Sequence, residues 1–389
     1  MKTGIVLSQK ASLFYKKRTE KSGKAVREMS EPGIAEIFTQ EDQAQEDQAQ
    51  EDQAQEDQAQ EVQVQEPQTQ EQQAQEKQLT KAQLSAIGFK DLEAEDLERY
   101  RPFYGLRPNK TADSVPLESY LWKDYYNARA AVAHRDGKEV GLLWLYGTEE
   151  DAFAAMPLCR DADMAYCFNE IKLYFNTVLR KPLMIKLADE EAIQVLQLSP
   201  SEFQVKEETD FRDYIYDGEA MRTLAGKKLH KKKNHYNKFV KEYEGRYEYR
   251  TLDCSCRDAV FAFLAKWRDT KGEDAEQHLD YEVEGIHNIL KNCAVIRAKM
   301  GGIYIDGELQ AFSIGSLNES EDMAVIHIEK ANPEIDGLYQ VINREFLLHE
   351  FPSVHLINRE DDVGLEGLRK SKLSYFPIEF AKKYAVIQL

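Results

Sequence analysis

The sequence has none of the short motifs that mark the commonest catalytic chemistries. It contains no G-x-x-x-x-G-K-[ST] phosphate loop, no H-E-x-x-H zinc motif, no G-x-S-x-G serine elbow and no G-x-G-x-x-G dinucleotide loop. These absences remove nucleotide hydrolysis, zinc proteolysis and serine hydrolysis from the leading functions.

Long apolar runs and paired cysteine motifs are also missing. No window approaches the roughly 20 apolar residues that a membrane-spanning helix needs, and the apolar run near the first residue is too short for a secretory signal. We therefore expect a cytoplasmic protein with no integral membrane segment. The five cysteines form no C-x-x-C pair and the histidines are scattered. This pattern predicts reduced thiols, without a disulfide framework or a metal site.

Charge is distributed unevenly along the chain, whose net charge is −18. Residues 41–60 are four EDQAQ pentads, and the repeat decays towards residue 80. A step of five residues rotates a helix by about 500°, so the few apolar residues never gather on one face. We predict a low-complexity tail, disordered or helical, over residues 1–80. The acidic remainder should repel nucleic acid except where a local basic patch overrides it.

Two similar units follow the tail. The stretch AAVAHRDGKEVGLLWLYG predicts a β-hairpin with its turn at Asp136-Gly137, and GGIYIDGELQAFSIGS predicts a second hairpin with its turn at Asp306-Gly307. Each hairpin precedes a pattern that is typical of a helix leading into a strand. The sequence thus predicts an α/β (α+β) fold of two duplicated domains, with mixed sheets flanked by helices, over residues 81–212 and 213–389.

Acidic residues are absent from residues 220–241, between the two hairpins. Apolar residues recur there at helical spacing and predict one long amphipathic helix over residues 218–243 that joins the domains. Its other face is basic. Either that face is simply solvated, or it binds an anion such as phosphate, which lysine contacts through charge alone. The candidate binding residues are Lys228, Lys231, Lys232, Lys233 and Asn234.

Two polar residues interrupt the apolar strand AVIHIEKA. His327 and Glu329 lie two positions apart, so regular alternation would place both side chains on one face of a sheet. A carboxylate in that position could orient or deprotonate an amine or hydroxyl nucleophile. The alternative is a strand side that faces solvent.

The stretch NREDDVGLEGLRKSKLSYFP, residues 358–377, is dense in charge of both signs. It predicts a strand-to-helix loop followed by a helix that begins after Gly364 and stops before Pro377. Functional polar groups often gather in such loops. The alternative is a set of charges that pair among themselves and fasten the C-terminal segment. The candidate residues are Asn358, Arg359, Glu360, Asp361, Asp362, Arg369, Lys372 and Tyr375.

This stretch, together with DYIYDGEAMRTLAGKKLHKKKNHYNKF, resembles a soluble family related to the C-terminal catalytic domain of phosphatidylglycerol lysyltransferases. That domain has tandem acyl-CoA N-acyltransferase (GNAT-like) folds. The resemblance covers about residues 84–389. Its anchors are the spacing of Gly364, Leu368, Lys372 and Pro377, the Asn-Arg-Glu-Asp loop, and the tyrosines ahead of the Gly-Lys-Lys segment. Fem-type peptidyltransferases, which take amino acids from aminoacyl-tRNA, are similar at a greater distance.

The resemblance implies an acyltransferase that moves an aminoacyl group from aminoacyl-tRNA to an amine or hydroxyl acceptor, with no further cofactor. The basic helix would follow the tRNA phosphates, and the acids Glu360, Asp361 and Asp362 would hold the ammonium group of the donor. Arg369 or Lys372 would stabilise the developing oxyanion. The resulting catalytic candidates are Glu329, Asp361, Arg369 and Lys372. His327, Asn358, Arg359, Tyr375 and the residues of the basic helix are candidates for substrate binding.

Two other functions stay open. The first is an N-acyltransferase that uses acyl-CoA, although the segment after AVIHIEKA offers one glycine, Gly337, in place of a glycine-rich pyrophosphate loop. The second is a non-catalytic module that binds RNA or a phosphorylated ligand. The acceptor could be a small molecule, a peptide or a lipid headgroup. A lipid is less expected, because the membrane-embedded half that lysyltransferases carry is not seen in this sequence.

Overall fold

Residues 78–270 and 278–389 are described by a computed structural model. The predicted tail therefore lies outside the described residues except for its last three positions. Leu79 is only 6% exposed and packs in a hydrophobic core. The side chain of Thr80 caps α3 (Lys81–Ser85) by accepting a hydrogen bond from the N–H of Gln83. The folded part thus begins slightly before the predicted boundary at residue 81.

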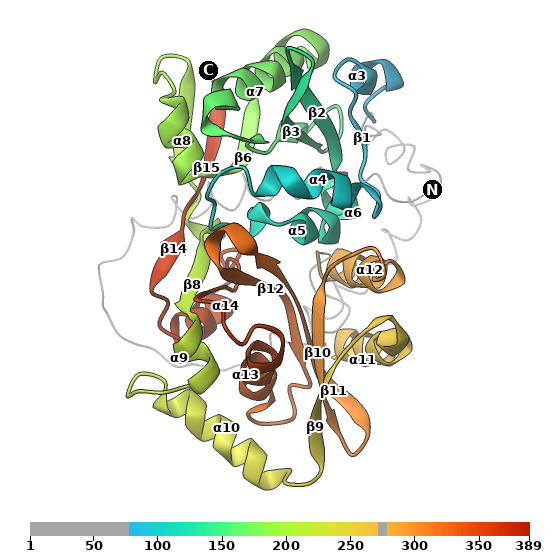
Figure 1. The fold of residues 1–389 in the computed structure, drawn as a ribbon, viewed down its shortest axis with the longest axis vertical. Coiled ribbons are helices and arrows are strands. Elements are labelled where there is room, and N and C mark those ends of the chain that lie inside the picture. Colours follow the sequence, from blue (N-terminus) through green and yellow to red (C-terminus); the bar gives the residue numbers. More distant parts are fainter. Residues whose placement is uncertain (1–77, 271–277) are drawn as a thin grey trace, which may run out of the picture. The chain divides into compact units, whose positions relative to one another are not determined.

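The first of two mixed sheets has the strand order β1-β2-β3-β4-β6-β15-β7, and β5 pairs with β3 (Figure 1). Its strands are β1 (Lys90–Asp91), β2 (Arg129–Arg135), β3 (Lys138–Tyr146), β4 (Phe153–Ala154), β5 (Leu158–Cys159), β6 (Met184–Asp189), β7 (Phe203–Glu207) and β15 (Lys383–Gln388). The accompanying helices are α4 (Asp96–Tyr104), α5 (Pro116–Leu121), α6 (Lys123–Tyr126), α7 (Asp161–Leu173) and α8 (Glu190–Leu196).

The second sheet has the order β14-β8-β13-β12-β11-β10-β9. Its strands are β8 (Asp213–Asp217), β9 (Tyr247–Thr251), β10 (Lys299–Ile305), β11 (Glu308–Asn318), β12 (Met323–Ala331), β13 (Leu356–Asn358) and β14 (Glu379–Ala381). Its helices are α9 (Gly218–Thr223), α10 (His230–Glu242), α11 (Arg257–Asp269), α12 (His278–Lys291), α13 (Leu338–Glu350) and α14 (Glu366–Leu373). Among the described residues, no helix is both long and apolar enough to cross a bilayer.

The two predicted hairpins are confirmed as β2–β3 and β10–β11. Both central residues of each turn have positive φ, namely 52° and 76° at Asp136-Gly137 and 51° and 86° at Asp306-Gly307. Asp-Gly suits this turn because both residues tolerate the left-handed region. A crossover helix and a parallel strand follow in each half: α7 precedes β6, which pairs with β4, and α13 precedes β13, which pairs with β12. The tandem GNAT-like architecture is therefore present.

The halves exchange a strand. The C-terminal strand β15 lies in the first sheet, antiparallel to β6 and β7. The strand between the halves, β8, holds the equivalent place in the second sheet, antiparallel to β13 and β14. The chain thus crosses from the second half back to the first at its end, so the first sheet is complete only with a strand from the C-terminal end of the chain. The domain boundary at residues 212 and 213 stays a prediction.

Hydrophobic side chains form layers around the two sheets. A shared core lies between them and is built from α4 and α5 of the first half and α11 and α12 of the second. The outer face of the first sheet packs on α7, and the outer face of the second sheet packs on α13, α9 and α10 (Figure 1). Because one continuous core joins both sheets, the apolar surface of each half is buried partly by the other.

The connecting segment is two helices, so the prediction of one helix over residues 218–243 is wrong. Helix α9 ends at Thr223, where Leu224 adopts a φ of 50°, and α10 begins at His230. Gly226 has a φ of 87° within the break. Its flexibility was a helix-breaking signal that the apolar periodicity masked. The predicted apolar face is nevertheless inward, because Met221, Leu224, Leu229 and Phe239 are buried.

Two of the five cysteines form a disulfide, Cys254–Cys293, which corrects the prediction of reduced thiols. Cys159, Cys167 and Cys256 are free. The bonded pair is separated by 39 residues and carries no local spacing motif. The pairing comes from the tertiary fold, which places the segment before α11 beside the segment after α12.

The N-terminus of α13 is covered by α10. Gly337, with a φ of 83°, precedes α13, and a Cβ at this position would lie 2.6 Å from the backbone oxygen of His235. The neighbouring Asp336 accepts hydrogen bonds from Lys238, at 2.7 Å, and His235, at 3.2 Å. The single glycine of this loop therefore serves the packing of α10 on α13.

We predict that Gly337→Ala destabilises the protein more than Gly226→Ala does. Both substitutions force a left-handed alanine, which costs about 1–2 kcal/mol. A Cβ at Gly226 meets nothing within 4 Å, whereas one at Gly337 meets the α10 backbone, and such overpacking adds about 1–3 kcal/mol. Urea unfolding of both variants checks this. Equal losses of stability would contradict the close packing of the two helices.

Candidate active site

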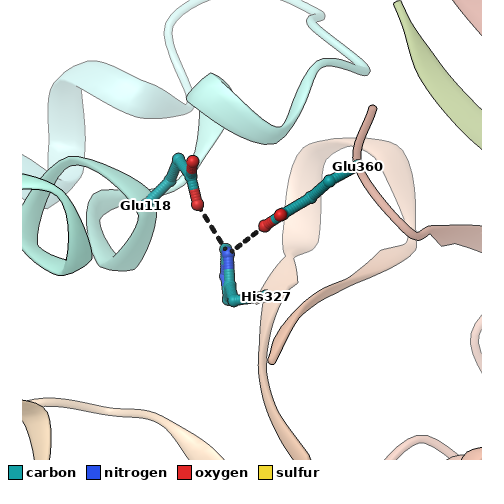
Figure 2. Close-up of side chains that lie close together, drawn as sticks. All are labelled: Glu118, His327 and Glu360. Atoms are coloured by element: carbon teal, nitrogen blue, oxygen red, sulfur yellow. Dashed lines mark hydrogen bonds and ion pairs between the residues drawn. The ribbon is translucent and has the colours of Figure 1, made fainter. Parts of the chain in front are cut away.

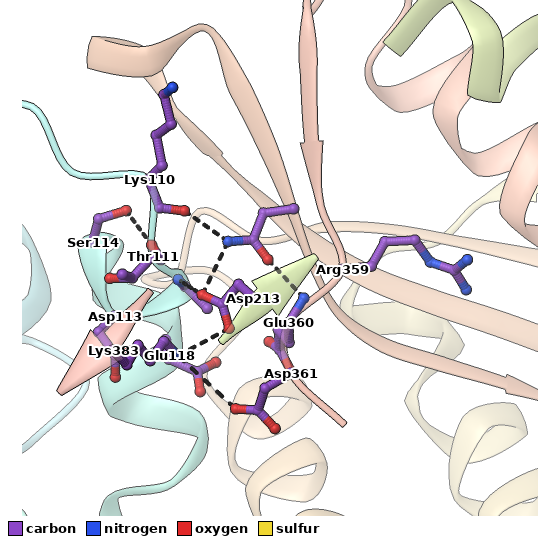
Figure 3. A network of polar contacts seen from close by, with 12 residues as sticks. Lys110, Thr111, Asp113, Ser114, Glu118, Asp213, Arg359, Glu360, Asp361 and Lys383 are labelled. Atoms are coloured by element: carbon purple, nitrogen blue, oxygen red, sulfur yellow. Dashed lines mark hydrogen bonds and ion pairs between the residues drawn. The ribbon is translucent and has the colours of Figure 1, made fainter. Parts of the chain in front are cut away.

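A buried lysine gathers acidic side chains from three segments (Figure 3). Lys383 of β15 places its Nζ 2.9 Å from Asp113, 2.9 Å from Asp213 of β8 and 3.9 Å from Asp361. Burial opposes the charged amine, but the three carboxylates outweigh it and raise the pKa of Lys383 well above its usual value. For Asp361, burial raises the pKa to about 6 despite the nearby lysine. This lysine cluster ties the end of the chain to the loop after β13.

Asn358 fixes the start of that loop. Its amide nitrogen donates to the backbone oxygen of Lys110 at 2.8 Å and to Asp213 at 3.2 Å, and its Oδ1 accepts from the N–H of Glu360 at 2.6 Å. Asn358 is completely buried. Glu360 adopts a φ of 58°, a region in which non-glycine residues are uncommon. The side chains of Arg359 and Glu360 are therefore held by a rigid, internally bonded loop.

The two halves meet at a histidine between two glutamates (Figure 2). Nδ1 of His327, on β12, lies 2.9 Å from the carboxylate of Glu118, on α5, and 2.9 Å from that of Glu360. Nε2 of the same ring lies 2.8 Å from Oγ of Ser316 on β11. The imidazole is fully buried, and the two glutamate side chains are 15% and 20% exposed.

The two glutamates respond to this arrangement differently. Burial would lower the pKa of His327, but its hydrogen bonds to both carboxylates raise the pKa to about 9. Burial and the charge of Glu118 raise the pKa of Glu360 well above its usual range. Burial also opposes the charge on Glu118, but the bond to His327 outweighs it and lowers the pKa of Glu118. Two carboxylates this close are not both ionised independently of each other. The three side chains therefore share their protons.

His327 and Glu329 do not share a face, contrary to the expectation from strand alternation. The register between β11 and β12 shifts at His327, which leaves a β-bulge. Ile326 and Ile328, on either side of it, pack into different cores. Glu329 consequently reaches Asn343 of α13, whereas His327 faces the first half. A bulge of this kind changes the facing of later residues without a signal in the sequence.

Glu329 and Arg359 form a second polar group in the second half. Their ion pair is 2.9 Å long, and the amide nitrogen of Asn343 donates to the other oxygen of Glu329 at 2.8 Å. The guanidinium of Arg359 lies 4.9 Å from the ring centroid of Tyr375, and the Lys232 ammonium lies 4.1 Å from the same centroid. Nη1 of Arg359 and Oδ1 of Asn343 are buried and have no hydrogen-bond partner among the described residues.

Arg369 and Asp362 belong to the support of the loop. Arg369 donates to both oxygens of Asp362, at 2.7 and 2.9 Å, and to Asp210 at 2.7 Å. Asp362 also accepts a hydrogen bond from the hydroxyl of Tyr214. These contacts use the arginine and the carboxylate to anchor α14 against β8. The geometry favours the pairing alternative for these two residues.

Lys372 is buried beneath the same loop. Its ammonium donates to the backbone carbonyls of Arg359, at 2.5 Å, and Asp361. Burial lowers the pKa of Lys372. The carbonyl of Lys372 accepts a hydrogen bond from the hydroxyl of Tyr216 at 2.9 Å. Lys372 therefore shapes the backbone that presents the two neighbouring functional side chains.

Helix α10 and the turn before it expose a row of lysines. The row consists of Lys227, Lys228, Lys231 and Lys233. None of these lysines forms an ion pair within the described part of the chain. Asn234 is also exposed and lies 3.4 Å from His230 within the helix. A pocket of about 380 Å³ opens beside the lysines. Aromatic side chains in its wall come from Tyr216, Tyr375 and Phe376.

Comparison with known proteins assigns the chain to a family. The sequence profile described as phosphatidylglycerol lysyltransferase, C-terminal, matches residues 117–387. The chain belongs to that family. The match begins at α5, the helix of Glu118, and it includes the histidine–glutamate trio, the Arg359 group and the lysine row. The resemblance expected from the C-terminal motif is thereby confirmed.

A sequence relative covers a smaller part of this chain. An uncharacterised protein of Mycoplasmoides gallisepticum is 28% identical over 180 residues. The match spans 45% of this chain and 55% of the relative. The chain thus aligns with about half the length of this curated relative.

Several solved structures share the fold. A conserved protein of unknown function from Bacteroides thetaiotaomicron is 26% identical, with a TM-score of 0.71, over 78% of this chain and all of that one. The structure of L-PGS from Bacillus licheniformis is 12% identical, with a TM-score of 0.56, over 77% and 93% of the two chains. FemX is 10% identical, with a TM-score of 0.53, over 77% and 97%. The last two likenesses concern the fold alone.

Several residues of this candidate site were not among the sequence candidates. Glu118 lies 209 positions from His327, and Lys383 lies in a strand whose partners are in the other half. Each is an ordinary charged residue within an amphipathic segment, so nothing local marked it. No local pattern marked the other missed residues either, which are Asp113, Asp213, Ser316 and Asn343.

We predict that Lys383→Met destabilises the fold by about 3–5 kcal/mol, because removal of one partner leaves buried carboxylates uncompensated. The matched control is Lys382→Met, which removes the neighbouring lysine, whose partner Glu190 is at the surface. We expect little change from that substitution. Chemical denaturation of both variants provides the measurement. A Lys383→Met protein as stable as the control would refute the structural role of the lysine cluster.

Proposed function

We propose that this protein is an acyltransferase that moves an aminoacyl group from aminoacyl-tRNA to an amine or hydroxyl acceptor. The single observation that carries the proposal is the pair of unpartnered buried atoms at Arg359 and Asn343, within a fold of the phosphatidylglycerol lysyltransferase family. One of these atoms is a hydrogen-bond donor and the other an acceptor. Buried polar atoms of this kind are usually satisfied, so their state suggests a ligand that completes them.

The polarity of the two atoms suits an aminoacyl ester. The Glu329 carboxylate can only accept hydrogen bonds, so the NH₂ of Asn343 faces it and Oδ1 is left for another donor. An α-ammonium group can donate to that Oδ1 and to the carboxylate of Glu329. Nη1 of Arg359 can donate to the ester carbonyl oxygen, which gains negative charge when the acceptor attacks. This assignment gives Arg359 the oxyanion role first expected of Arg369 or Lys372.

The transfer itself needs no bound redox group. The acceptor nitrogen or oxygen forms a bond to the ester carbonyl carbon, and the bond between that carbon and the ribose oxygen of tRNA then breaks. The ribose oxygen takes up a proton, and the acceptor loses one. In this scheme Arg359 stabilises the intermediate, while Lys372, Arg369 and Asp362 keep its loop in place.

The exposed lysines fit the nucleic-acid part of the donor. Phosphates are bound through charge, and the lysines of the row next to the 380 Å³ pocket form no ion pair with a carboxylate in the described part of the chain. A terminal base could stack on the aromatic wall of that pocket, because base–aromatic stacking accepts any base. The side chain of Lys232 extends from α10 to the ring of Tyr375 and so lies between the lysine row and the Arg359 group.

An acyl-CoA donor has less support. Its pyrophosphate would need a free helix N-terminus with exposed N–H groups. Asp161 and Asp163 occupy the first turn of α7, which disfavours an anion there. In the second half, Asp336 and the backbone of α10 cover the start of α13.

We predict that Arg359→Gln strongly reduces a preference for charged over uncharged tRNA. A hydrogen bond to a charged group contributes about 1.5–3 kcal/mol, so the preference should fall at least about tenfold. Filter binding with total tRNA, charged with radiolabelled amino acids or deacylated, measures the ratio. Arg344→Gln is the control, since it also removes an arginine paired with a glutamate, Glu345. If the folded Arg359→Gln protein keeps the preference for charged tRNA, this assignment of the donor site is wrong.

We further predict that changing Lys228, Lys231, Lys232 and Lys233 to Gln weakens tRNA binding and flattens its salt dependence. Each phosphate contact contributes about 0.7–0.9 to the slope of log K against log salt, so up to about three units of slope should be lost. The control changes four exposed lysines elsewhere, Lys138, Lys206, Lys291 and Lys299.

Affinity measured between low and moderate salt gives both slopes. Equal slopes in the two quadruple variants would show that the lysine row is an ordinary solvated face. Strong tRNA binding without any transfer, tested with amine acceptors, would favour the non-catalytic binding module over the enzyme.

A further inference from the structure

We propose that Glu118, His327 and Glu360 bind one divalent transition-metal ion, such as Zn²⁺ or Mn²⁺. The three side chains offer one ligand atom each, and these atoms all lie within 4.8 Å of one another. Imidazole and carboxylate groups are the usual protein ligands for such ions. This site departs from the sequence prediction, which contains no metal site, and it does not rest on the proposed transfer reaction.

The distances within the trio suit a metal centre. Both carboxylates approach the same Nδ1 at 2.9 Å. With bonds of about 2.1 Å to the metal, ligand atoms at right angles lie about 3.0 Å apart. Both nitrogen–oxygen distances therefore already have about the length that two ligands of one ion require. Figure 2 shows both carboxylates directed at one side of the imidazole ring.

Hydrogen bonding alone serves this geometry poorly. A single Nδ1–H lies along one direction in the ring plane, so it can be aligned with one carboxylate oxygen but not with both. In the part of the chain that the structure describes, neither Glu118 nor Glu360 has an ion pair with lysine or arginine. Two carboxylates that converge on one buried point without a cation of their own are better matched by a doubly charged ion than by a single proton.

The surroundings of His327 are those of a metal ligand. Ser316 contacts the other ring nitrogen at 2.8 Å and can accept its N–H, which leaves the lone pair of Nδ1 directed at the carboxylates. The β-bulge fixes the ring in this direction. The glutamates are partly exposed, so solvent can reach the open coordination positions.

A metal here would join the two halves. Glu118 comes from α5 of the first half, whereas His327 and Glu360 belong to the second. The ion would thus add a link next to the lysine cluster, and its binding should stabilise the fold, because the unfolded chain lacks the assembled site.

The test is metal binding by the full chain after chelator treatment and dialysis. We expect calorimetry and elemental analysis to give one Zn²⁺ or Mn²⁺ per chain, with a higher melting temperature for the loaded protein. Glu118→Gln and Glu360→Gln should each remove binding, because the neutral amide lacks the charge of the carboxylate ligand. The fold should persist, since glutamine has nearly the same shape and can still accept from Nδ1–H. Ser316→Ala should weaken binding about 10- to 100-fold, as expected for a residue that orients a metal ligand.

The matched control is His355→Gln, which removes an exposed histidine paired with Asp322. This substitution should leave binding unchanged. No binding by the wild-type chain would overturn the proposal in favour of a proton-sharing trio. Binding that survives both glutamine variants, or that disappears in His355→Gln, would place the ion elsewhere and overturn it equally. Because no tRNA or acceptor is present, these outcomes are independent of those for aminoacyl transfer.

Discussion

The ion cluster around Lys383 is the interaction on which the rest of the site depends. Its amine meets Asp113 from the first half, Asp213 from the strand between the halves and Asp361 from the loop after β13. Buried carboxylates are costly without a counter-charge. The lysine is supplied by β15, so the strand exchange that joins the two sheets also completes the charge balance beneath the loop.

That loop directs the side chains of its neighbouring residues Arg359 and Glu360 to two different sites. Asn358 and Lys372 bind its backbone, Arg359 is directed to Glu329 and Asn343, and Glu360 is directed to His327. The bulge at His327 separates the two groups by turning successive polar residues of β12 to different sides. The proposed donor site in the second half and the proposed metal site at the junction are therefore built from neighbouring residues of one loop.

Local chemistry explains which sequence-based expectations succeeded. The Asp-Gly hairpins were recognised because the turn type depends on those two residues alone, and the helix after Gly364 because glycine and proline bound it. The prediction of one long connecting helix failed because the apolar spacing continues past Gly226, where the chain breaks between α9 and α10. Residues 358–362 form the predicted polar loop between a strand and a helix. The partners of its side chains lie in other segments and could not be predicted from the loop sequence. Arg369 and Asp362, for example, anchor α14.

The sequence by itself determined the repeated α/β units, the basic segment between them, the polar loop and the family. These features follow from periodicity, turn residues and motifs within short windows. Only the tertiary structure decided that Glu118 meets His327 across 209 positions, that Cys254 bonds to Cys293, and that Lys383 returns to the first sheet. The reason is physical: burial, strand exchange and a one-residue bulge set which side chains meet, and none of these leaves a local periodicity in the chain.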